Sequence, residues 1–154
     1  MKLFRNRIDA GRTLARELMQ YAGRDDVVVL ALPRGGVPVA FEVATALNAP
    51  MDVFVVRKLG LPGREEFAMG AVASGGVRVL NEVVVRSYRI PRATIDSIAQ
   101  REQWELERRE RAYRNGRPMP ELTNKTIILV DDGLATGTTM RAAVTALRPY
   151  KPAP

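Results

Sequence analysis

The chain has 154 residues, 46% of them hydrophobic, so its length and composition suit one domain with a substantial core. It contains no cysteine and no histidine, which excludes disulfides, thiolate chemistry and histidine-based acid–base or zinc sites. Twenty-four basic residues, only four of them lysine, against 17 acidic ones give a net charge of +7. This excess favours acidic ligands such as phosphates, and it also suits nucleic acid.

The segment from Asp9 to Gly23 predicts an amphipathic helix. Leu14, Leu18 and Tyr21 stand at helical spacing, Asp9 is the expected N-cap, and Gly23 is the expected stop. The basic residues before this segment are followed by no apolar leader region, and no run of about 18 apolar residues occurs. We therefore expect a soluble, cytoplasmic protein with no membrane partner.

The next 36 or so residues have the pattern of a βαβ unit. Residues 27–32 (VVVLAL) predict a strand, residues 37–48 a helix with an apolar stripe that includes Phe41, and residues 52–58 (DVFVVRK) a second strand. Parallel strands of this kind are buried on both faces of the sheet.

The middle of the chain predicts a β-hairpin and then a long helix. Residues 67–73 and 77–80, joined by a Ser-Gly-Gly turn, form the hairpin. Residues 91–114 form the helix, with Trp104 and Tyr113 expected as packing anchors. Charged residues dominate its later part, and acids interleave with bases, so we expect a solvated surface rather than a nucleic-acid site. Pairs four residues apart, each contributing about 0.2–0.5 kcal/mol, join Glu105 to Arg109, Glu107 to Arg111 and Glu110 to Arg114.

Residues 125–130 (KTIILV) predict a third core strand, and residues 138–147 a final helix that stops before Pro149. The expected fold class is therefore α/β. It has a mostly parallel central sheet with helices on both faces, plus the hairpin and the long charged helix, in one domain of residues 1–154.

The stretch VDDGLATGTTM places a strand end, a short loop and a helix start at one junction. Such a junction exposes backbone N–H groups at the positive end of a helix dipole and binds anions. Thr136, Thr138 and Thr139 add hydroxyl donors, and Gly137 lets the backbone approach a phosphate. The pattern predicts a site for a monophosphate.

Asp131 and Asp132 stand at the carboxyl end of the third strand, where open α/β sheets bind ligands. Carboxylates repel a phosphate, so they must face another part of the ligand: the adjacent hydroxyls of a ribose, or Mg²⁺ held directly or through water. An ordinary turn with Thr138 as N-cap is the alternative. The combination of acids, glycine and threonines at one junction favours a phosphosugar site.

The stretch IILVDDGLATGTTM resembles the phosphoribosylpyrophosphate (PRPP) signature of type I phosphoribosyltransferases. ALPRGGVP at residues 31–38 resembles the family's pyrophosphate-binding loop, and VVRKLGLPG at residues 55–63 resembles its second-strand segment. The resemblance spans residues 3–147 in the family's order. It implies PRPP contacts at Arg34, Gly35, Gly36, Arg57, Lys58, Asp131, Asp132, Gly133, Ala135, Thr136, Gly137, Thr138 and Thr139.

The resemblance also implies a reaction, in which a nitrogenous acceptor displaces pyrophosphate from the ribose anomeric carbon with Mg²⁺ as cofactor. Arg34 and Lys58 would stabilise the leaving pyrophosphate, and Asp131 and Asp132 would hold the ribose and the metal. Family members often have a non-proline cis or strained peptide in the pyrophosphate loop. No enzyme nucleophile is required, which fits a chain without cysteine or histidine.

Two features depart from the family pattern. Ala135 stands where members that use hypoxanthine or guanine carry a third acid, which disfavours that specificity. After ALRPYKPAP the family continues into further strands, so we expect C-terminal truncation and a hydrophobic strand edge that promotes association, such as a homodimer.

Other functions remain open at this point. The first alternative is a non-catalytic PRPP- or nucleotide-binding regulatory protein. A nucleic-acid-binding protein is less favoured, and a hydrolase lacks an assignable acid and base. The sequence identifies neither the acceptor nor the part of the chain that binds it.

Overall fold

The computed structural model describes residues 4–114, 119–132 and 138–153. The chain divides into two compact units. The first unit contains residues 1–54, 118–135 and 150–154, and the second contains residues 55–117 and 136–149.

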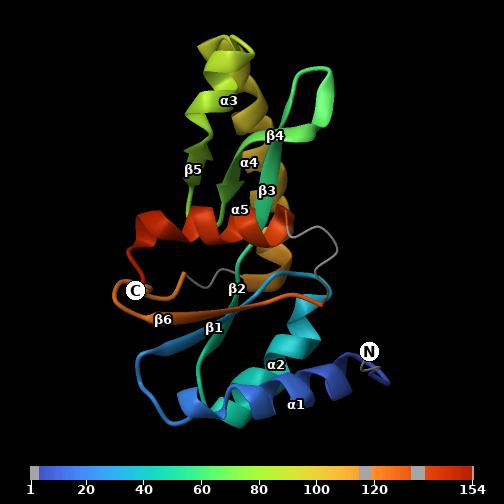
Figure 1. Ribbon diagram of the computed structural model, residues 1–154, viewed down its shortest axis with the longest axis vertical. Helices are drawn as coiled ribbons and strands as arrows, with labels where there is room; N and C mark the ends of the chain where they lie inside the picture. The colour runs from blue at the N-terminus through green and yellow to red at the C-terminus, as the bar shows by residue number, and fades with distance from the viewer. Residues whose placement is uncertain (1–3, 115–118, 133–137, 154) are drawn as a thin grey trace. The chain divides into compact units, whose positions relative to one another are not determined.

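The first unit contains a parallel sheet of three strands in the order β2 (Met51–Val53), β1 (Val27–Ala31) and β6 (Thr126–Val130) (Figure 1). In the register of the sheet, Ala31 pairs with Val53 on one side and with Val130 on the other. All five residues of β1 are buried, as the uninterrupted apolar run predicted. The predicted βαβ unit and the α/β fold class are confirmed.

Two helices build the rest of the first unit. Helix α2 (Gly36–Leu47) packs on the sheet, and α1 (Arg7–Glu17) packs on α2, followed by the 3₁₀ turn η1 (Met19–Tyr21). A Cβ atom at Gly11 would lie 2.7 Å from Glu42 Cβ and 2.8 Å from the backbone oxygen of Val39. The glycine in α1 therefore allows the two helices to approach closely. The core between them and the sheet contains Ala15, Val29, Ala31, Val39, Ala40, Val43, Ala44, Leu47 and Val130.

The N-cap of α1 is Asn6, and the prediction of Asp9 was wrong. The Asn6 side chain accepts a hydrogen bond of 2.8 Å from the Asp9 backbone N–H, so Asp9 lies inside the first turn. An asparagine in extended conformation satisfies one of the unpaired donors at the helix start, which is the ordinary role of an N-cap. The helix consequently begins at Arg7, three residues earlier than an Asp9 N-cap implies, and it ends at Glu17, before the predicted stop at Gly23.

The second unit contains an antiparallel sheet of β3 (Val56–Leu61), β4 (Arg64–Ala73) and β5 (Val77–Leu80). The predicted hairpin is confirmed as β4 and β5. The predicted single strand 52–58 was wrong, because its hydrogen bonding changes partner in the middle. The Phe54 N–H donates to the backbone oxygen of Ala31, whereas the Val55 N–H donates to the Ser74 hydroxyl. Residues 56–58 therefore belong to β3 and to a different sheet.

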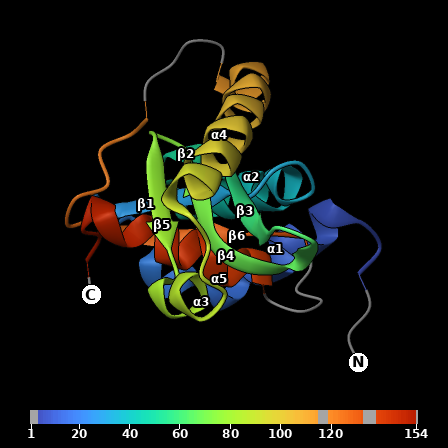
Figure 2. The same ribbon diagram turned by 90° about the horizontal axis from the view of Figure 1, so that it is seen from above.

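The helices of the second unit are α3 (Glu82–Ser87), α4 (Arg92–Arg114) and α5 (Thr138–Leu147), with the 3₁₀ turn η2 (Arg148–Tyr150) after α5. The sequence predicted α4 and α5 and missed the short α3. Helices α4 and α5 lie on opposite faces of the antiparallel sheet. Two successive residues of β3, which point to opposite faces of the sheet, show this. Arg57 pairs with Glu102 of α4, whereas its neighbour Lys58 lines a hollow with Arg141 of α5. Figure 2 shows the sheet and these helices from above.

Most predicted ion pairs of α4 are present. Arg109 lies 3.1 Å from Glu105, and Arg114, which is buried, lies 3.0 Å from Glu110. Arg108 also pairs with Glu105. The predicted pairing of Arg111 with the Glu107 carboxylate was wrong, because Arg111 Nε donates to the backbone oxygen of Glu107.

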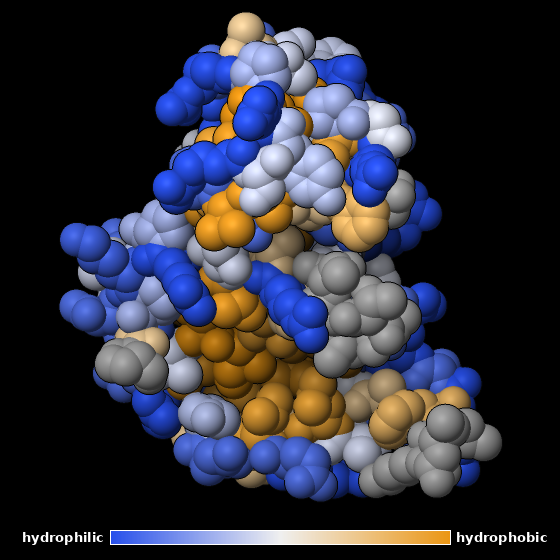
Figure 3. All heavy atoms as spheres, turned by 45° about the horizontal axis from the view of Figure 1, so that its top comes forward, coloured by the Kyte–Doolittle hydropathy of each residue, from blue (hydrophilic) through white to orange (hydrophobic). Residues whose placement is uncertain are grey.

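Two predicted core aromatics lie at the surface. Trp104 is 61% exposed and Phe41 is 59% exposed, so neither is a packing anchor. The buried hydrophobic residues of α4 are Ile95, Ala99 and Leu106, because only one stripe of a half-covered helix meets the sheet. Hydrophobic side chains reach the surface among hydrophilic ones in Figure 3. No helix among the described residues is long and apolar enough to cross a membrane.

Candidate functional site

The loop after β1 and the two aspartates after β6 meet at one edge of the parallel sheet. Strands β1 and β6 are parallel neighbours, and Ala31 and Val130 stand side by side at their carboxyl ends. The residues that follow, Arg34 to Gly36 after β1 and Asp131 and Asp132 after β6, therefore lie together. In the sheet, β2 lies on one side of β1 and β6 lies on the other, so the strand order reverses between β1 and β6. Open α/β sheets bind their ligands at such a point of reversed strand order.

The two glycines of the loop after β1 are packed directly against the strand end of β6. A Cβ atom at Gly35 would overlap the carboxylate of Asp132, and one at Gly36 would lie 2.6 Å from the backbone oxygen of Val130. Any larger residue at either position would have to displace the acidic segment. The glycines thus allow the acidic segment and the loop to form one surface.

The loop also has a backbone feature that the family resemblance implies, because the peptide bond between Pro33 and Arg34 is cis. The Arg34 side chain is exposed. Helix α2 begins at Gly36, so its positive dipole end faces the same loop. An exposed guanidinium and a helix start at one loop favour anions there.

The two aspartates have different electrostatic surroundings. The Asp132 backbone N–H donates to Asp131 Oδ1 at 2.8 Å. Burial raises the pKa of Asp131 above its ordinary value, whereas a hydrogen bond from Arg7 lowers the pKa of Asp132. Asp132 is therefore held as a carboxylate by a specific cation.

Arg7 is the site residue that sequence reasoning missed. Its Nη2 and Nε lie 2.8 and 3.3 Å from Asp132 Oδ2. The two residues are 125 positions apart, and no helical or strand periodicity connects them. The only signal in the sequence was the group of basic residues near the N-terminus. We used these residues only to test for a leader region.

Arg57 and Lys58 belong to the second unit, whereas the loop after β1 and the two aspartates belong to the first. Arg57 Nε donates to Glu102 Oε2 at 2.6 Å, so its charge is paired with α4. Lys58 lines a hollow of about 590 Å³ that also contains Phe67 and Arg141. The first unit thus brings together five of the predicted residues: Arg34, Gly35, Gly36, Asp131 and Asp132.

The loop that follows the aspartates lies mostly outside the described residues. This applies to four predicted contacts, Gly133, Ala135, Thr136 and Gly137. Thr138 begins α5, and Thr139 is exposed in its first turn. The predicted phosphate-binding role of these residues stays a prediction.

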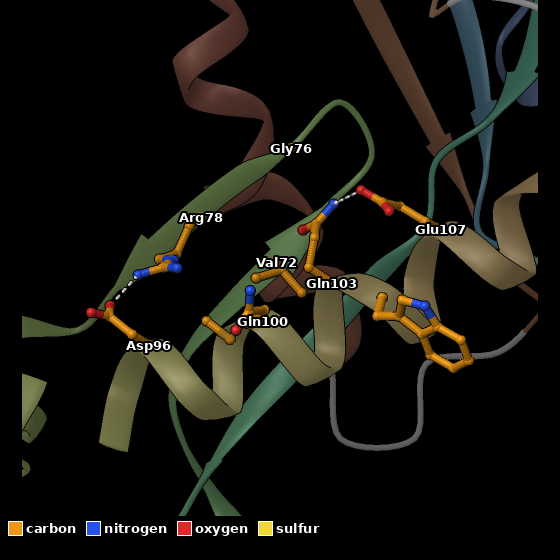
Figure 4. Close-up of a pocket in the computed structure, with 9 residues that line it drawn as sticks. Val72, Gly76, Arg78, Asp96, Gln100, Gln103 and Glu107 are labelled. Atoms are coloured by element: carbon orange, nitrogen blue, oxygen red, sulfur yellow. Dashed lines mark hydrogen bonds and ion pairs between the residues drawn. The ribbon is translucent and has the colours of Figure 1, made fainter. Parts of the chain in front are cut away.

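A second hollow, of about 540 Å³, lies between the β4–β5 hairpin and α4 in the second unit (Figure 4). Two pairs of its polar side chains contact each other. Arg78 lies 2.8 Å from Asp96, and Gln103 donates to Glu107 at 3.3 Å. It contains none of the residues predicted for the site.

Comparisons with known proteins identify the family of the chain. The model of the phosphoribosyl transferase domain family matches residues 3–153. Two Mycobacterium tuberculosis proteins (strains CDC 1551 and H37Rv), each named "Putative phosphoribosyl transferase", are 52% identical to the chain over 150 residues. The match covers 97% of the chain and 34% of each relative, so the chain spans about a third of their length.

Two solved structures share the fold. The crystal structure of TT1426 from Thermus thermophilus has a TM-score of 0.88 at 42% identity, over 98% of this chain and 71% of that one. A purine phosphoribosyltransferase from Pyrococcus horikoshii has a TM-score of 0.50 at 20% identity, over 97% and 69%. The second likeness is one of fold alone.

Proposed function

The chain belongs to the phosphoribosyltransferase family, and on that premise we propose that it transfers the phosphoribosyl group of PRPP to a nitrogenous acceptor. One observation carries the proposal: Arg34, Gly35 and Gly36 lie at the same sheet edge as Asp131 and Asp132. The Arg34 guanidinium and the backbone N–H groups of a glycine loop suit the pyrophosphate of PRPP. The paired carboxylates suit its ribose hydroxyls.

The proposed reaction is a substitution at the anomeric carbon. The lone pair of the acceptor nitrogen forms the new C–N bond, the C–O bond to pyrophosphate breaks, and its electron pair leaves with pyrophosphate. The acceptor nitrogen then loses a proton to solvent. Asp131 and Asp132 would orient the ribose and favour the positive charge that develops on it, and Arg34 would favour the charge on the leaving group. No side chain acts as a nucleophile.

The donor set is compatible with Mg²⁺. Proteins usually hold this ion through one or two carboxylates together with oxygens of a phosphate-bearing substrate. Asp131 and Asp132 are two such carboxylates, and no cluster of three side chains able to hold a metal occurs among the residues that the structure describes. These aspartates would hold the ion with the substrate, directly or through water, and the ion would neutralise charge on the pyrophosphate.

The remaining predicted contacts complete the proposal. The loop of Thr136 to Thr139 would bind the 5′-phosphate and supply binding energy remote from the reacting carbon. The PRPP contacts that the resemblance implies for Arg57 and Lys58 stay predictions, since both residues belong to the second unit. Ala135 disfavours hypoxanthine and guanine as acceptors, and the acceptor itself is left to experiment.

The test is pyrophosphate release from PRPP and Mg²⁺ across a panel of nitrogenous bases and aromatic amines. The proposal predicts release that depends on one class of acceptor. Calorimetric binding of PRPP without release under any acceptor would support a regulatory, non-catalytic protein instead. Absence of PRPP binding would contradict the transferase and a PRPP-binding regulator, and a regulator that binds nucleotides would then be tested with nucleotides.

A further inference from the structure

We propose that Arg7 is a further substrate-binding residue of this site, which contacts the pyrophosphate group and is held in position by Asp132. The inference rests on the proposed function and adds a residue from the N-terminal helix to the loop after β1. Three observations support it: the N–H donors of Arg7 that Asp132 does not use, the position of the guanidinium beside the loop, and the packing of α1 on α2.

The ion pair with Asp132 leaves most of the Arg7 guanidinium available. A guanidinium has five N–H donors in a planar fork. Two nitrogens of Arg7, Nε and Nη2, contact a single carboxylate oxygen, Oδ2 of Asp132. The side chain of Arg7 is 57% exposed, so the rest of the fork faces solvent. A planar fork of this kind binds phosphate oxygens in pairs.

The guanidinium lies beside the predicted pyrophosphate loop. The carboxylate that Arg7 contacts is the one packed against Gly35, so it touches the middle of that loop. Asp132 by itself would repel a pyrophosphate bound there. Arg7 neutralises this charge and, together with Arg34, gives the loop a second guanidinium. The Asp132 carboxylate therefore positions the Arg7 guanidinium beside the loop, and the ion pair reduces the repulsion between this carboxylate and a bound anion.

The position of Arg7 is set by packed structure. Arg7 is the first residue of α1, which Asn6 caps. The helix is pressed against α2 at Gly11, and α2 itself begins at the loop, at Gly36. A cation at a helix N-terminus opposes the helix dipole, so this arginine is placed against local helix preference. A role in binding an anion accounts for a placement that helix stability does not favour.

The experiment compares Arg7→Gln with Arg16→Gln in the full chain. Both substitutions remove one positive charge from an exposed arginine of α1, and only Arg7 lies at the site. The probes are PRPP and inorganic pyrophosphate, each with Mg²⁺, and ribose 5-phosphate, titrated by calorimetry. We expect Arg7→Gln to weaken PRPP and pyrophosphate binding on the order of tenfold to a hundredfold, as loss of a charged hydrogen bond does.

Three comparisons separate the outcomes. Ribose 5-phosphate has no pyrophosphate, so its affinity should change by less than about threefold, whereas a purely structural loss would weaken all three ligands alike. Arg7→Lys should retain part of the affinity, since it keeps the charge but not the fork. Unchanged or tighter binding of pyrophosphate by Arg7→Gln overturns the inference about Arg7 and leaves the proposed function standing. If the unaltered chain binds neither PRPP nor pyrophosphate, the proposed function fails, and the inference fails with it.

Discussion

At the scale of single residues, the positions of Asp131 and Asp132 could be predicted from the sequence. Their place after an apolar strand predicted that they would stand at a ligand-binding edge, and parallel pairing of β1 and β6 puts the loop after β1 beside them. Arg7 could not be predicted in this way. Its contact depends on how α1 packs on α2, and no local pattern encodes a contact between positions 7 and 132.

The first prediction concerns Gly35. Its Cα faces the Asp132 carboxylate, so the methyl group of Gly35→Ala would overlap that side chain. We expect a loss of stability of about 1–3 kcal/mol, as overpacking usually causes, and PRPP binding weakened by about tenfold or more. Thermal unfolding and calorimetric titration measure the two effects.

The control for Gly35→Ala is the double variant with Asp132→Ala, which removes the overlapping carboxylate. Stability should recover toward that of Asp132→Ala alone, while PRPP binding should stay weak because the carboxylate is absent. If Gly35→Ala by itself leaves both stability and binding unchanged, the loop and the acid are not packed as described.

At the scale of elements, the approach of α1 to α2 is the feature that positions Arg7. In Gly11→Val the added side chain would meet the backbone oxygen of Val39 and the Glu42 side chain. We expect a loss of about 1–3 kcal/mol in the free energy of unfolding, measured by denaturant titration. Arg16→Ala, an exposed change on the same helix, should alter stability by less than about 0.5 kcal/mol. Equal effects of the two substitutions would contradict the close helix packing.

The charged part of α4 gives a prediction about pH. Arg108 and Arg109 lower the pKa of Glu105 from 4.5 to about 2. A carboxyl with a depressed folded-state pKa stabilises the protein fully above its unfolded-state pKa, and the contribution disappears as pH falls through the folded-state value. The melting temperatures of the unaltered chain and Glu105→Gln should therefore differ at neutral pH and converge as pH falls from about 4.5 toward 2.

The matched control on α4 is Glu107→Gln, an exposed glutamate whose side chain accepts only from Gln103 among the contacts that the structure describes. Its difference in melting temperature from the unaltered chain should show less dependence on pH. A Glu105→Gln curve parallel to that of the unaltered chain from pH 7 to pH 2 would show that the two arginine contacts contribute nothing.

The elements that sequence reasoning found were those with strong local signals. The apolar run of β1, the Ser-Gly-Gly turn between β4 and β5, and the length of α4 were all visible in the pattern. The division between β2 and β3 was not visible, because Phe54 and Val55 are as apolar as the strands around them. Only the change of hydrogen-bond partner from Ala31 to Ser74 separates the strands. Trp104 was misplaced because the sheet covers only one stripe of α4.

At the scale of the whole molecule, the net charge of +7 is compatible with both phosphosugar and nucleic-acid ligands. Association with nucleic acid would weaken steeply with rising salt and would not respond to PRPP. The described part of α4 argues against it, since Glu105 pairs with Arg108 and Arg109, two exposed arginines that would otherwise meet phosphates. The expected homodimer stays a prediction, and light scattering across protein concentrations measures it.

The chain spans about a third of its Mycobacterium tuberculosis relatives, with 34% of each covered, so substrate binding is a more direct test of the site than turnover. The central claim is that Asp131 and Asp132, with the loop after β1, bind PRPP. Calorimetric titration with PRPP and Mg²⁺ should show binding by the unaltered chain and a loss on the order of a hundredfold in the double variant Asp131→Asn, Asp132→Asn, with the melting temperature of the free protein little changed. Equal PRPP affinity of the two proteins would contradict the account.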